Sequence, residues 1–221
     1  MNLFIYLVIK LFLFICNIEI EIINKCKKMH PIAICNHITK LDPLIMYMVL
    51  YILHSKYRFI SDIDIKKIPI IYNFAKQYKT IFITRDENGF EKIKKKIKPN
   101  DNIFIFPEGY LYHKTTVIKS NDLCKKLNIK NFNNTLCPKN KGFNFISKIL
   151  KPKKISDFTL KYQFKNNIGL KDIEKPITIN NFFKFMPSKI IVVIEEKKID
   201  YKDVNTVTNL FREKDLLLDK L

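Results

Sequence analysis

Hydrophobic positions along the chain follow two different periods, which predict strands that alternate with helices. Segments of four to six residues with an apolar or alternating pattern are typical of strands, and they cover residues 18–23, 31–35, 80–84, 103–106 and 190–194. Longer segments with helical spacing begin at Leu3, Asp42, Asn88 and Val207. Strands alternating with helices favour an α/β fold. We therefore expect a single domain with a mixed, mostly parallel sheet flanked by helices.

The N-terminal segment is the most apolar part of the chain. Residues 3–16 read LFIYLVIKLFLFIC and contain one charged side chain, Lys10. The run is shorter than a membrane-spanning helix requires, and it lacks the charged flank and cleavage site of a signal peptide. It predicts either a buried core helix or a helix lying in one membrane leaflet, with Lys10 reaching the headgroups. We favour the second, with residues 1–16 as a membrane-associated helix and residues 17–221 as the domain that follows.

Composition limits the classes of partner. The formal net charge of +19 suggests an anionic partner, such as nucleic acid, an acidic membrane or a phosphorylated ligand. Part of this charge has a simpler origin, because the excess of Lys, Asn, Ile, Phe and Tyr is what an AT-rich coding sequence produces. The lysines are scattered, and no nucleic-acid-binding motif is present, so we expect no nucleic acid partner. The five cysteines show no CxxC spacing, which argues against a zinc site and a disulfide framework; we expect no metal.

A histidine and an aspartate stand five positions apart in the segment 36–42, which reads NHITKLD. Asp42 followed by Pro43 is a good helix start, with Asp42 as N-cap, so capping alone could explain this aspartate. Positions five apart do not share a face of one helix. The pair can meet only across a strand–loop–helix turn, which the surrounding pattern predicts. In such a turn, His37 would take a proton from an attacking hydroxyl while Asp42 fixes the tautomer of its ring.

Two more strand ends carry residues suited to ligand binding. Residues 106–109 read FPEG and follow an apolar strand; ligand sites of α/β folds gather at the carboxyl ends of strands. Gly109 would let the backbone approach a ligand, although a plain strand-ending turn is the alternative. Arg85 ends another strand and is one of three arginines in the chain. Its guanidinium could bind phosphate, or it could be an ordinary surface arginine.

In this order, the three segments resemble the motifs of the lysophosphatidic acid acyltransferase family, the glycerophospholipid acyltransferases. That family has N-H-x4-D, then a strand ending in Arg, then a strand ending in F-P-E-G; the matching residues here are 36–42, 82–85 and 106–109. Segments 136–143 and 211–218 are similar to a eukaryotic branch that includes lysocardiolipin, lysophosphatidylinositol and some lysophosphatidic acid acyltransferases. The resemblance runs from about residue 17 to the end of the chain, with a motif-bearing core at about 30–145.

The resemblance implies an acyltransferase that moves a fatty acyl group from acyl-CoA, its co-substrate, to a hydroxyl of a lysophospholipid. The first expectation is conversion of 1-acyl-glycerol-3-phosphate to phosphatidic acid, with His37 as general base oriented by Asp42 and with no cofactor. Arg85, Glu108 and Gly109 would bind the substrate headgroup. The expected location is a membrane, of the endoplasmic reticulum or another endomembrane, and the oligomeric state stays open.

The chain departs from the family pattern after FPEG. Tyr110, Leu111 and Tyr112 stand where many members have Thr, Arg and Ser, so phosphate binding here needs another group, for which Lys114 is the candidate. Lysocardiolipin and lysophosphatidylinositol are alternative acceptor types, and acyl carrier protein is an alternative donor. A catalytically inactive, lipid-binding relative is the further alternative.

Overall fold

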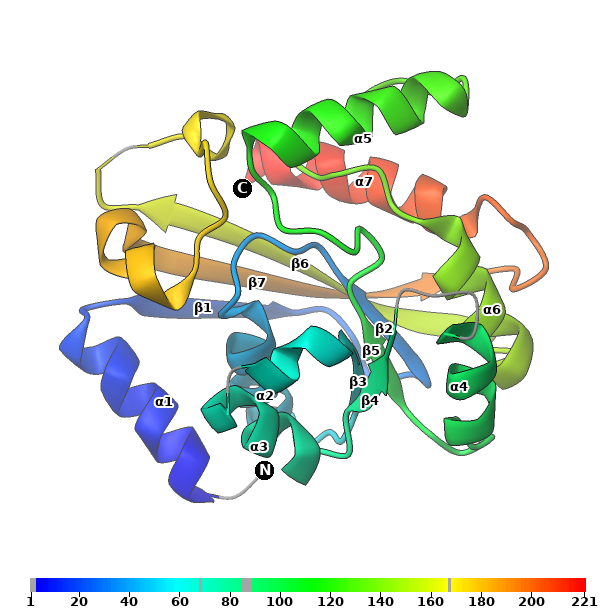
Figure 1. Ribbon diagram of the computed structural model, residues 1–221, viewed down its shortest axis with the longest axis horizontal. Coiled ribbons are helices and arrows are strands. Elements are labelled where there is room, and N and C mark those ends of the chain that lie inside the picture. The colour runs from blue at the N-terminus through cyan, green and yellow to red at the C-terminus, as the bar shows by residue number, and fades with distance from the viewer. Residues whose placement is uncertain (1–2, 68, 85–88, 167) are drawn as a thin grey trace.

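In the computed structural model, the described residues are 3–67, 69–84, 89–166 and 168–221, and they form one seven-stranded sheet (Figure 1). The strand order is β1-β7-β6-β2-β5-β3-β4. All neighbouring strands run parallel except β6 and β7, which are antiparallel. The strands are β1 (Glu19–Asn24), β2 (Ile32–Cys35), β3 (Arg58–Asp62), β4 (Ile81–Ile83), β5 (Ile103–Ile105), β6 (Lys154–Phe164) and β7 (Pro187–Lys198). The expected single α/β domain with a mixed, mostly parallel sheet is confirmed.

Helices cover both faces of the sheet (Figure 1). The α-helices are α1 (Leu3–Ile15), α2 (Asp42–Ile52), α3 (Pro69–Gln77), α4 (Gly89–Lys96), α5 (Lys114–Lys126), α6 (Asn140–Leu150) and α7 (Thr206–Lys220). Three short 3-10 helices accompany them: η1 (Ile63–Lys67), η2 (Leu170–Asp172) and η3 (Ile179–Phe185). Strands β6, β2 and β5 are the three middle strands of the sheet, and the carboxyl end of β2 lies beside Phe158 of β6.

Strand β2 shows why the sheet has a core on each side. Its side chains point alternately to the two faces. Ile32 and Ile34 pack in the core beneath α6 and α7, whereas Ala33 and Cys35 pack in the core that includes α1 and α2. All four are fully buried, which is the continuous apolar pattern of a parallel strand covered on both faces. Burial from both sides makes β2 a rigid support for the loop that follows it.

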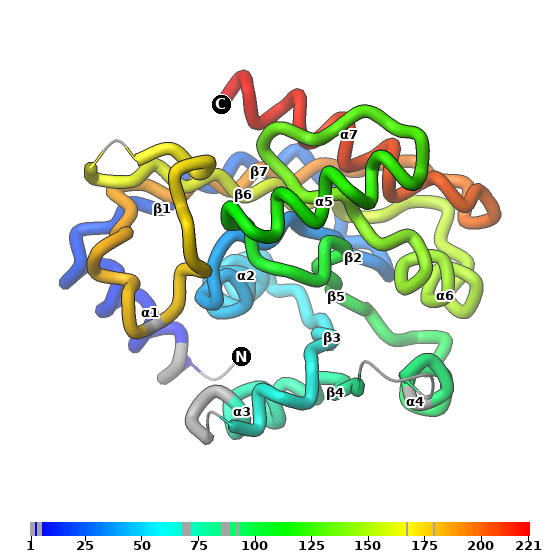
Figure 2. The backbone as a smooth tube through the Cα atoms, turned by 45° about the horizontal axis from the view of Figure 1, so that its top comes forward, coloured from blue at the N-terminus to red at the C-terminus, as the bar shows by residue number. Residues whose placement is uncertain are grey.

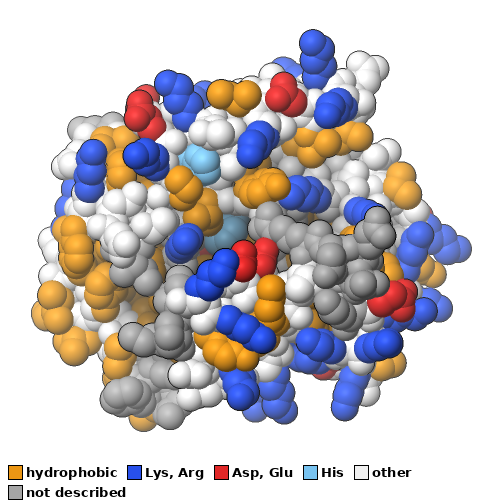
Figure 3. Space-filling view, in the orientation of Figure 1, with side chains coloured by type: hydrophobic (Ala, Val, Ile, Leu, Met, Phe, Trp, Pro, Cys, Tyr) orange, Lys and Arg blue, Asp and Glu red, His pale blue; other side chains and the backbone are white. Residues whose placement is uncertain are grey.

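Helix α1 packs on the domain through one side and exposes the other. Ile9 and Leu13 are buried, and Lys165 Nζ donates to the carbonyl of Cys16 at 2.9 Å. Hydrophobic side chains gather on its outer side, at the lower left of Figure 3: Leu3, Leu7, Val8, Leu11, Phe12, Phe14 and Ile15. None of the helices in the described ranges combines the length and the apolar character that crossing a bilayer requires. The predicted N-terminal helix is present as α1, and its contact with a membrane stays a prediction.

Candidate active site

The loop between β2 and α2 brings His37 to Asp42. Strand β2 ends at Cys35 and α2 begins at Asp42, so the two side chains meet across a strand–loop–helix turn. His37 Nδ1 lies 2.9 Å from Asp42 Oδ2. The Asp42 side chain is fully buried, while 19% of the His37 side chain is exposed. One member of the pair is thus fixed in the core and the other reaches solvent.

Four further donors surround the Asp42 carboxylate. The N–H groups of Ile38 and Thr39 donate to Oδ2 at 2.6 and 2.9 Å. The hydroxyls of Thr39 and Tyr162 donate to Oδ1 at 2.7 and 2.6 Å. The expectation that Asp42 is the N-cap of its helix is wrong: Leu41 is the cap, Asp42 is the first helical residue, and its side chain points back to the loop. The upstream donors hold it there, so the carboxylate serves the loop and His37.

The ring of Phe106 stacks on the ring of His37. The two ring centroids lie 4.3 Å apart with an interplanar angle of 23°. No hydrogen bond to Nε2 of His37 is found in the described part of the chain. A neutral histidine with Nδ1 protonated presents Nε2 as an acceptor. His37 can therefore accept a proton at Nε2 from a group that enters the site.

Glu108 is placed beside the histidine, with its carboxylate turned inward. Its Oε2 accepts the N–H of His37 at 2.5 Å, and its Oε1 accepts the N–H of Leu136 at 2.8 Å. Only 2% of the residue is exposed. Burial disfavours the charged carboxylate and raises its pKa to about 8, although both N–H groups oppose this shift. Glu108 thus ties the His37 loop to the segment before α6, and its role in headgroup binding stays a prediction.

Gly109 and Lys139 lie together at the carboxyl end of β5. Gly109 has φ +66°, and a Cβ at this position would lie 3.3 Å from Lys139 Nζ, so a larger residue would strain the backbone and crowd the lysine. Lys139 Nζ lies 3.7 Å from the ring centroid of Tyr110. The main-chain N–H of Lys139 donates to the carbonyl of Pro107 at 2.8 Å. Lys119 lines a pocket beside the same loop. The sequence reasoning missed Lys139, although it follows directly after Leu136-Cys137-Pro138 in a segment already noted.

Two other residues were predicted for substrate binding. Lys114 is the exposed first residue of α5, and its N–H donates to the carbonyl of Ile173 at 2.8 Å. Its proposed phosphate contact stays a prediction. Arg85 lies outside the described residues.

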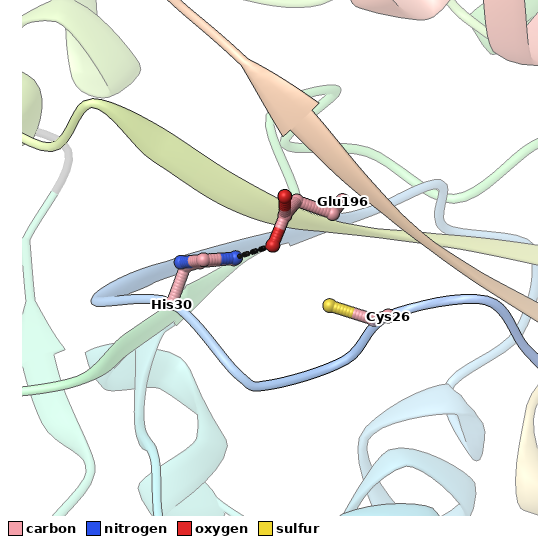
Figure 4. A group of neighbouring side chains, drawn as sticks. All are labelled: Cys26, His30 and Glu196. Atoms are coloured by element: carbon pink, nitrogen blue, oxygen red, sulfur yellow. Dashed lines mark hydrogen bonds and ion pairs between the residues drawn. The ribbon is translucent and has the colours of Figure 1, made fainter.

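Within the described ranges, one side-chain group has suitable donors for a metal ion: Cys26, His30 and Glu196, whose ligand atoms lie within 4.8 Å of one another (Figure 4). These donors already have partners. His30 Nε2 lies 2.6 Å from Glu196 Oε2, Glu196 also pairs with Lys154, and the Cys26 thiol donates to the carbonyl of Lys28 at 2.8 Å. His30 precedes β2 whereas His37 follows it, so this group lies at the opposite end of the strand from the His37–Asp42 pair.

Comparisons with known proteins place the chain in a family. The family model described as "Acyltransferase" matches residues 17–150, a range that includes His37, Asp42, Glu108 and Gly109. No curated protein sequence matches the chain. A similar solved structure is the crystal structure of the 1-acyl-sn-glycerophosphate (LPA) acyltransferase, PlsC, from Thermotoga maritima, with a TM-score of 0.59 and 15% identity over 98% of this chain and 76% of that chain. At this identity, the likeness shows a shared fold.

Proposed function

The chain belongs to the acyltransferase family and is an acyltransferase, and we propose that it transfers a fatty acyl group from acyl-CoA to a hydroxyl of a lysophospholipid. The observation that carries the proposal is the His37–Asp42 pair at the end of β2, with Nδ1 bound to the carboxylate and Nε2 without a partner in the described part of the chain. We take 1-acyl-glycerol-3-phosphate as the first acceptor to test. The printed name of the PlsC structure supports that choice.

In the proposed reaction, Nε2 of His37 removes the proton of the acceptor hydroxyl. The oxygen then attacks the thioester carbonyl and forms a C–O bond, which gives a tetrahedral oxyanion. Collapse of this species breaks the C–S bond, and the CoA thiolate takes the proton from Nε2. General-base catalysis of this kind contributes about 10²- to 10⁴-fold to a rate. Because the acceptor attacks the thioester directly, no acyl-enzyme nucleophile is required.

Asp42 keeps the His37 ring ready for this proton transfer. An Nδ1–H donated to Asp42 leaves Nε2 as the acceptor, and the carboxylate stabilises the imidazolium that forms. The carboxylate itself cannot turn away easily, since Ile38, Thr39 and Tyr162 all donate to it. Stacking on Phe106 limits rotation of the ring. The base is therefore oriented before any substrate arrives, which lowers the cost of reaching the transition state.

Many family members have an Arg shortly after FPEG, where this chain has Leu111. In the proposed substrate complex, lysines near this loop bind phosphate in its place. Lys139 lies against Gly109 and Tyr110, and Lys119 lines the neighbouring pocket. An ammonium group binds phosphate as a point charge. We propose that Lys139 contacts the acceptor phosphate and that the other lysines, Lys114 included, favour the phosphates of CoA. Lys and Arg side chains are spread over the face shown in Figure 3, which suits an anionic membrane.

Helix α1 is the proposed membrane contact. Its outer side exposes large apolar side chains, and Phe14 and Ile15 remain 81% and 72% exposed. Such side chains gain free energy when they enter the boundary between headgroups and acyl chains. A helix lying on the surface in this way would hold the site where lysophospholipids are found. We propose an endomembrane, such as the endoplasmic reticulum, as the location.

The test is an acyl-transfer assay on membranes that carry the full chain. Wild type, His37→Ala and His54→Asn receive labelled oleoyl-CoA with a panel of lysophospholipids. His54 is exposed and serves as the control, with Asn because its φ of +48° would strain an alanine. We expect transfer to lysophosphatidic acid that is lost in His37→Ala and kept in His54→Asn. Transfer retained in His37→Ala would overturn the mechanism.

The acceptor and donor panels separate the alternatives. Preference for lysocardiolipin or lysophosphatidylinositol would correct the acceptor, and transfer only from an acylated carrier protein would correct the donor. Absence of transfer by folded wild type with either donor would favour the alternative of an inactive lipid-binding relative.

A further inference from the structure

The main chain of His37 is held on both sides by segment 108–112, which begins within FPEG. Its N–H donates to Glu108 Oε2 at 2.5 Å, and its carbonyl accepts the N–H of Tyr112 at 3.0 Å. In Figure 2, the chain leaving β5 (green) passes beside the loop between β2 and α2 (blue). The position of the proposed base therefore depends on how firmly Glu108 and Tyr112 are fixed.

Both of these residues are in turn bound to segment 133–136, which lies between α5 and α6. Glu108 Oε1 accepts the N–H of Leu136 at 2.8 Å. The hydroxyl of Tyr112 donates to the carbonyl of Asn133 at 3.0 Å. Burial, together with Asp215 and Glu108, raises the pKa of Tyr112 to about 12, so its hydroxyl remains protonated and can donate near neutral pH. Tyr112 is one of the residues at which this chain departs from the family pattern.

Asp215 of α7 holds segment 133–136 from the other side. Its carboxylate accepts three consecutive peptide N–H groups, from Asn133 at 2.9 Å, Asn134 at 2.7 Å and Thr135 at 2.9 Å. The Thr135 hydroxyl donates to it as well, at 3.2 Å. Asp215 is 6% exposed and Thr135 is 2% exposed. Hydrogen bonds to a buried charged group are among the stronger ones in proteins, so this contact fixes the segment firmly.

We propose that Asp215 is a positioning residue for acyl transfer, which holds the main chain of His37 through segment 133–136 and through Glu108 and Tyr112. This inference rests on the proposed function of His37. Two routes lead from α7 to the main chain of His37. One passes through Asn133 and Tyr112 to the His37 carbonyl. The other passes from Thr135 to the adjacent Leu136 and through Glu108 to the His37 N–H. Because both routes end on the base, loosening their common anchor displaces His37 relative to Asp42 and to the acceptor hydroxyl. A small displacement at a reacting group can cost about 100-fold in rate.

The test compares Asp215→Asn with Glu213→Gln in the full chain. Asparagine keeps one acceptor oxygen, and its NH2 group would take the place of Oδ2, which accepts the N–H of Asn133. Glu213 lies on the same helix, is 58% exposed in its side chain and pairs with Lys197. In Asp215→Asn we expect kcat to fall by about 10- to 100-fold, with the KM for acyl-CoA unchanged and faster hydrogen exchange of the His37 amide. Glu213→Gln should leave all three quantities as in wild type.

A second variant separates positioning from loss of fold. Tyr112→Phe removes one hydroxyl and keeps the buried ring, so it tests the route through Asn133 even where Asp215→Asn fails to fold. It should lower kcat and speed exchange of the Tyr112 amide, which donates to the His37 carbonyl; in the double variant the two effects on kcat should be less than multiplicative, as for coupled residues. Wild-type exchange of the His37 amide in Asp215→Asn, or of the Tyr112 amide in Tyr112→Phe, would overturn the proposal, as would multiplicative effects. The exchange readout needs no substrate, so it stands when wild type transfers no acyl group and only the proposed function fails.

Discussion

The hydroxyl of Tyr162 donates a 2.6 Å hydrogen bond to Oδ1 of Asp42, so a residue of β6 fixes the carboxylate that faces His37 from 120 positions along the chain. Burial, and after it the nearby Asp42, raises the pKa of Tyr162 well above its ordinary value, which keeps the hydroxyl protonated. The bond joins the antiparallel part of the sheet to the loop after β2. The orientation of the proposed base therefore depends on β6 as well as on the loop that contains His37.

Tyr162→Phe should weaken catalysis more than it weakens the fold. The change removes one of the donors on Asp42 and leaves the ring in place. We expect a loss of about 1–2 kcal/mol in the free energy of unfolding and a fall in kcat of about tenfold. Tyr57→Phe is the matched control, since its buried hydroxyl donates to the carbonyl of His30 before β2. It should cost similar stability and leave kcat unchanged; equal kcat values in the two variants would remove Tyr162 from the mechanism.

Asp42→Asn should abolish most acyl transfer while the fold remains. A carboxamide oxygen can accept only some of the five donors, and the amide nitrogen must face one of them, which favours the wrong tautomer of His37. By analogy with the aspartate of serine protease triads, we expect kcat to fall by about 10³- to 10⁴-fold. Kinetics would be measured on samples whose circular dichroism matches wild type. Activity near the wild-type level would leave Asp42 as a loop-stabilising residue only.

The sequence predicted β1 from its alternating pattern, and β2, β4, β5 and β7 from their apolar runs. Strands β3 and β6 were missed, and β6 shows the reason. It carries Ser156, Asp157 and Thr159, which are all buried, and buried polar residues break the pattern on which the prediction depends. Each has a partner: Lys214 of α7 lies 2.5 Å from Asp157 and 3.1 Å from the Thr159 hydroxyl, and Ser156 accepts the N–H of His30 at 3.0 Å. A pairing across 57 positions leaves no local signal in the sequence.

The distinction between local patterns and contacts of distant residues also explains which site residues could be predicted. His37 and Asp42 were found because one short loop contains both, and the strand–loop–helix turn could be predicted from local pattern alone. The helix-cap role expected for Asp42 was wrong, since the upstream N–H groups of the loop compete for its carboxylate. Tyr162 and Lys139 reach the site only through tertiary packing, from β6 and from the start of α6. The contribution of Tyr162 depends on a strand pairing that the sequence did not predict, whereas Lys139 stands in a segment that the sequence had already singled out.

The raised pKa of Glu108 predicts how stability depends on pH. Its pKa is 4.5 ordinarily and about 8 in the folded protein, mainly because of burial. Between these values, folded Glu108 holds a proton that the unfolded chain has released, so its contribution to stability falls as pH rises. We expect wild type to lose a few kcal/mol relative to Glu108→Gln between about pH 5 and pH 8.5. Urea unfolding of both proteins at the two pH values measures this, and a constant difference would show that Glu108 is ionised throughout.

Lys139→Gln should raise the KM for an acceptor that carries a phosphate monoester. The ammonium lies between Gly109 and Tyr110 at the end of β5. Glutamine has a side chain of similar length but carries no charge. A charge-assisted bond to phosphate contributes about 1.5–3 kcal/mol, so we expect a rise in KM of about 10- to 100-fold. Lys148→Gln, on α6, is the control. An unchanged KM in Lys139→Gln would move the phosphate site to another lysine.

Membrane binding should depend on the outer side of α1. Deleting residues 1–16 would also remove Ile9, Leu13 and Cys16 from the core, so point substitutions give the cleaner test. Phe14→Glu with Ile15→Glu places two charges where 81% and 72% of the residues are exposed, and the buried side of the helix is untouched. We expect binding to sedimented vesicles with anionic lipid to fall by at least about tenfold. Ile118→Glu, at a 57% exposed site on α5, should bind as wild type does. If the α1 variant still sediments fully with vesicles, the membrane contact lies on another surface of the domain. The lysines on the face shown in Figure 3 would then be substituted next.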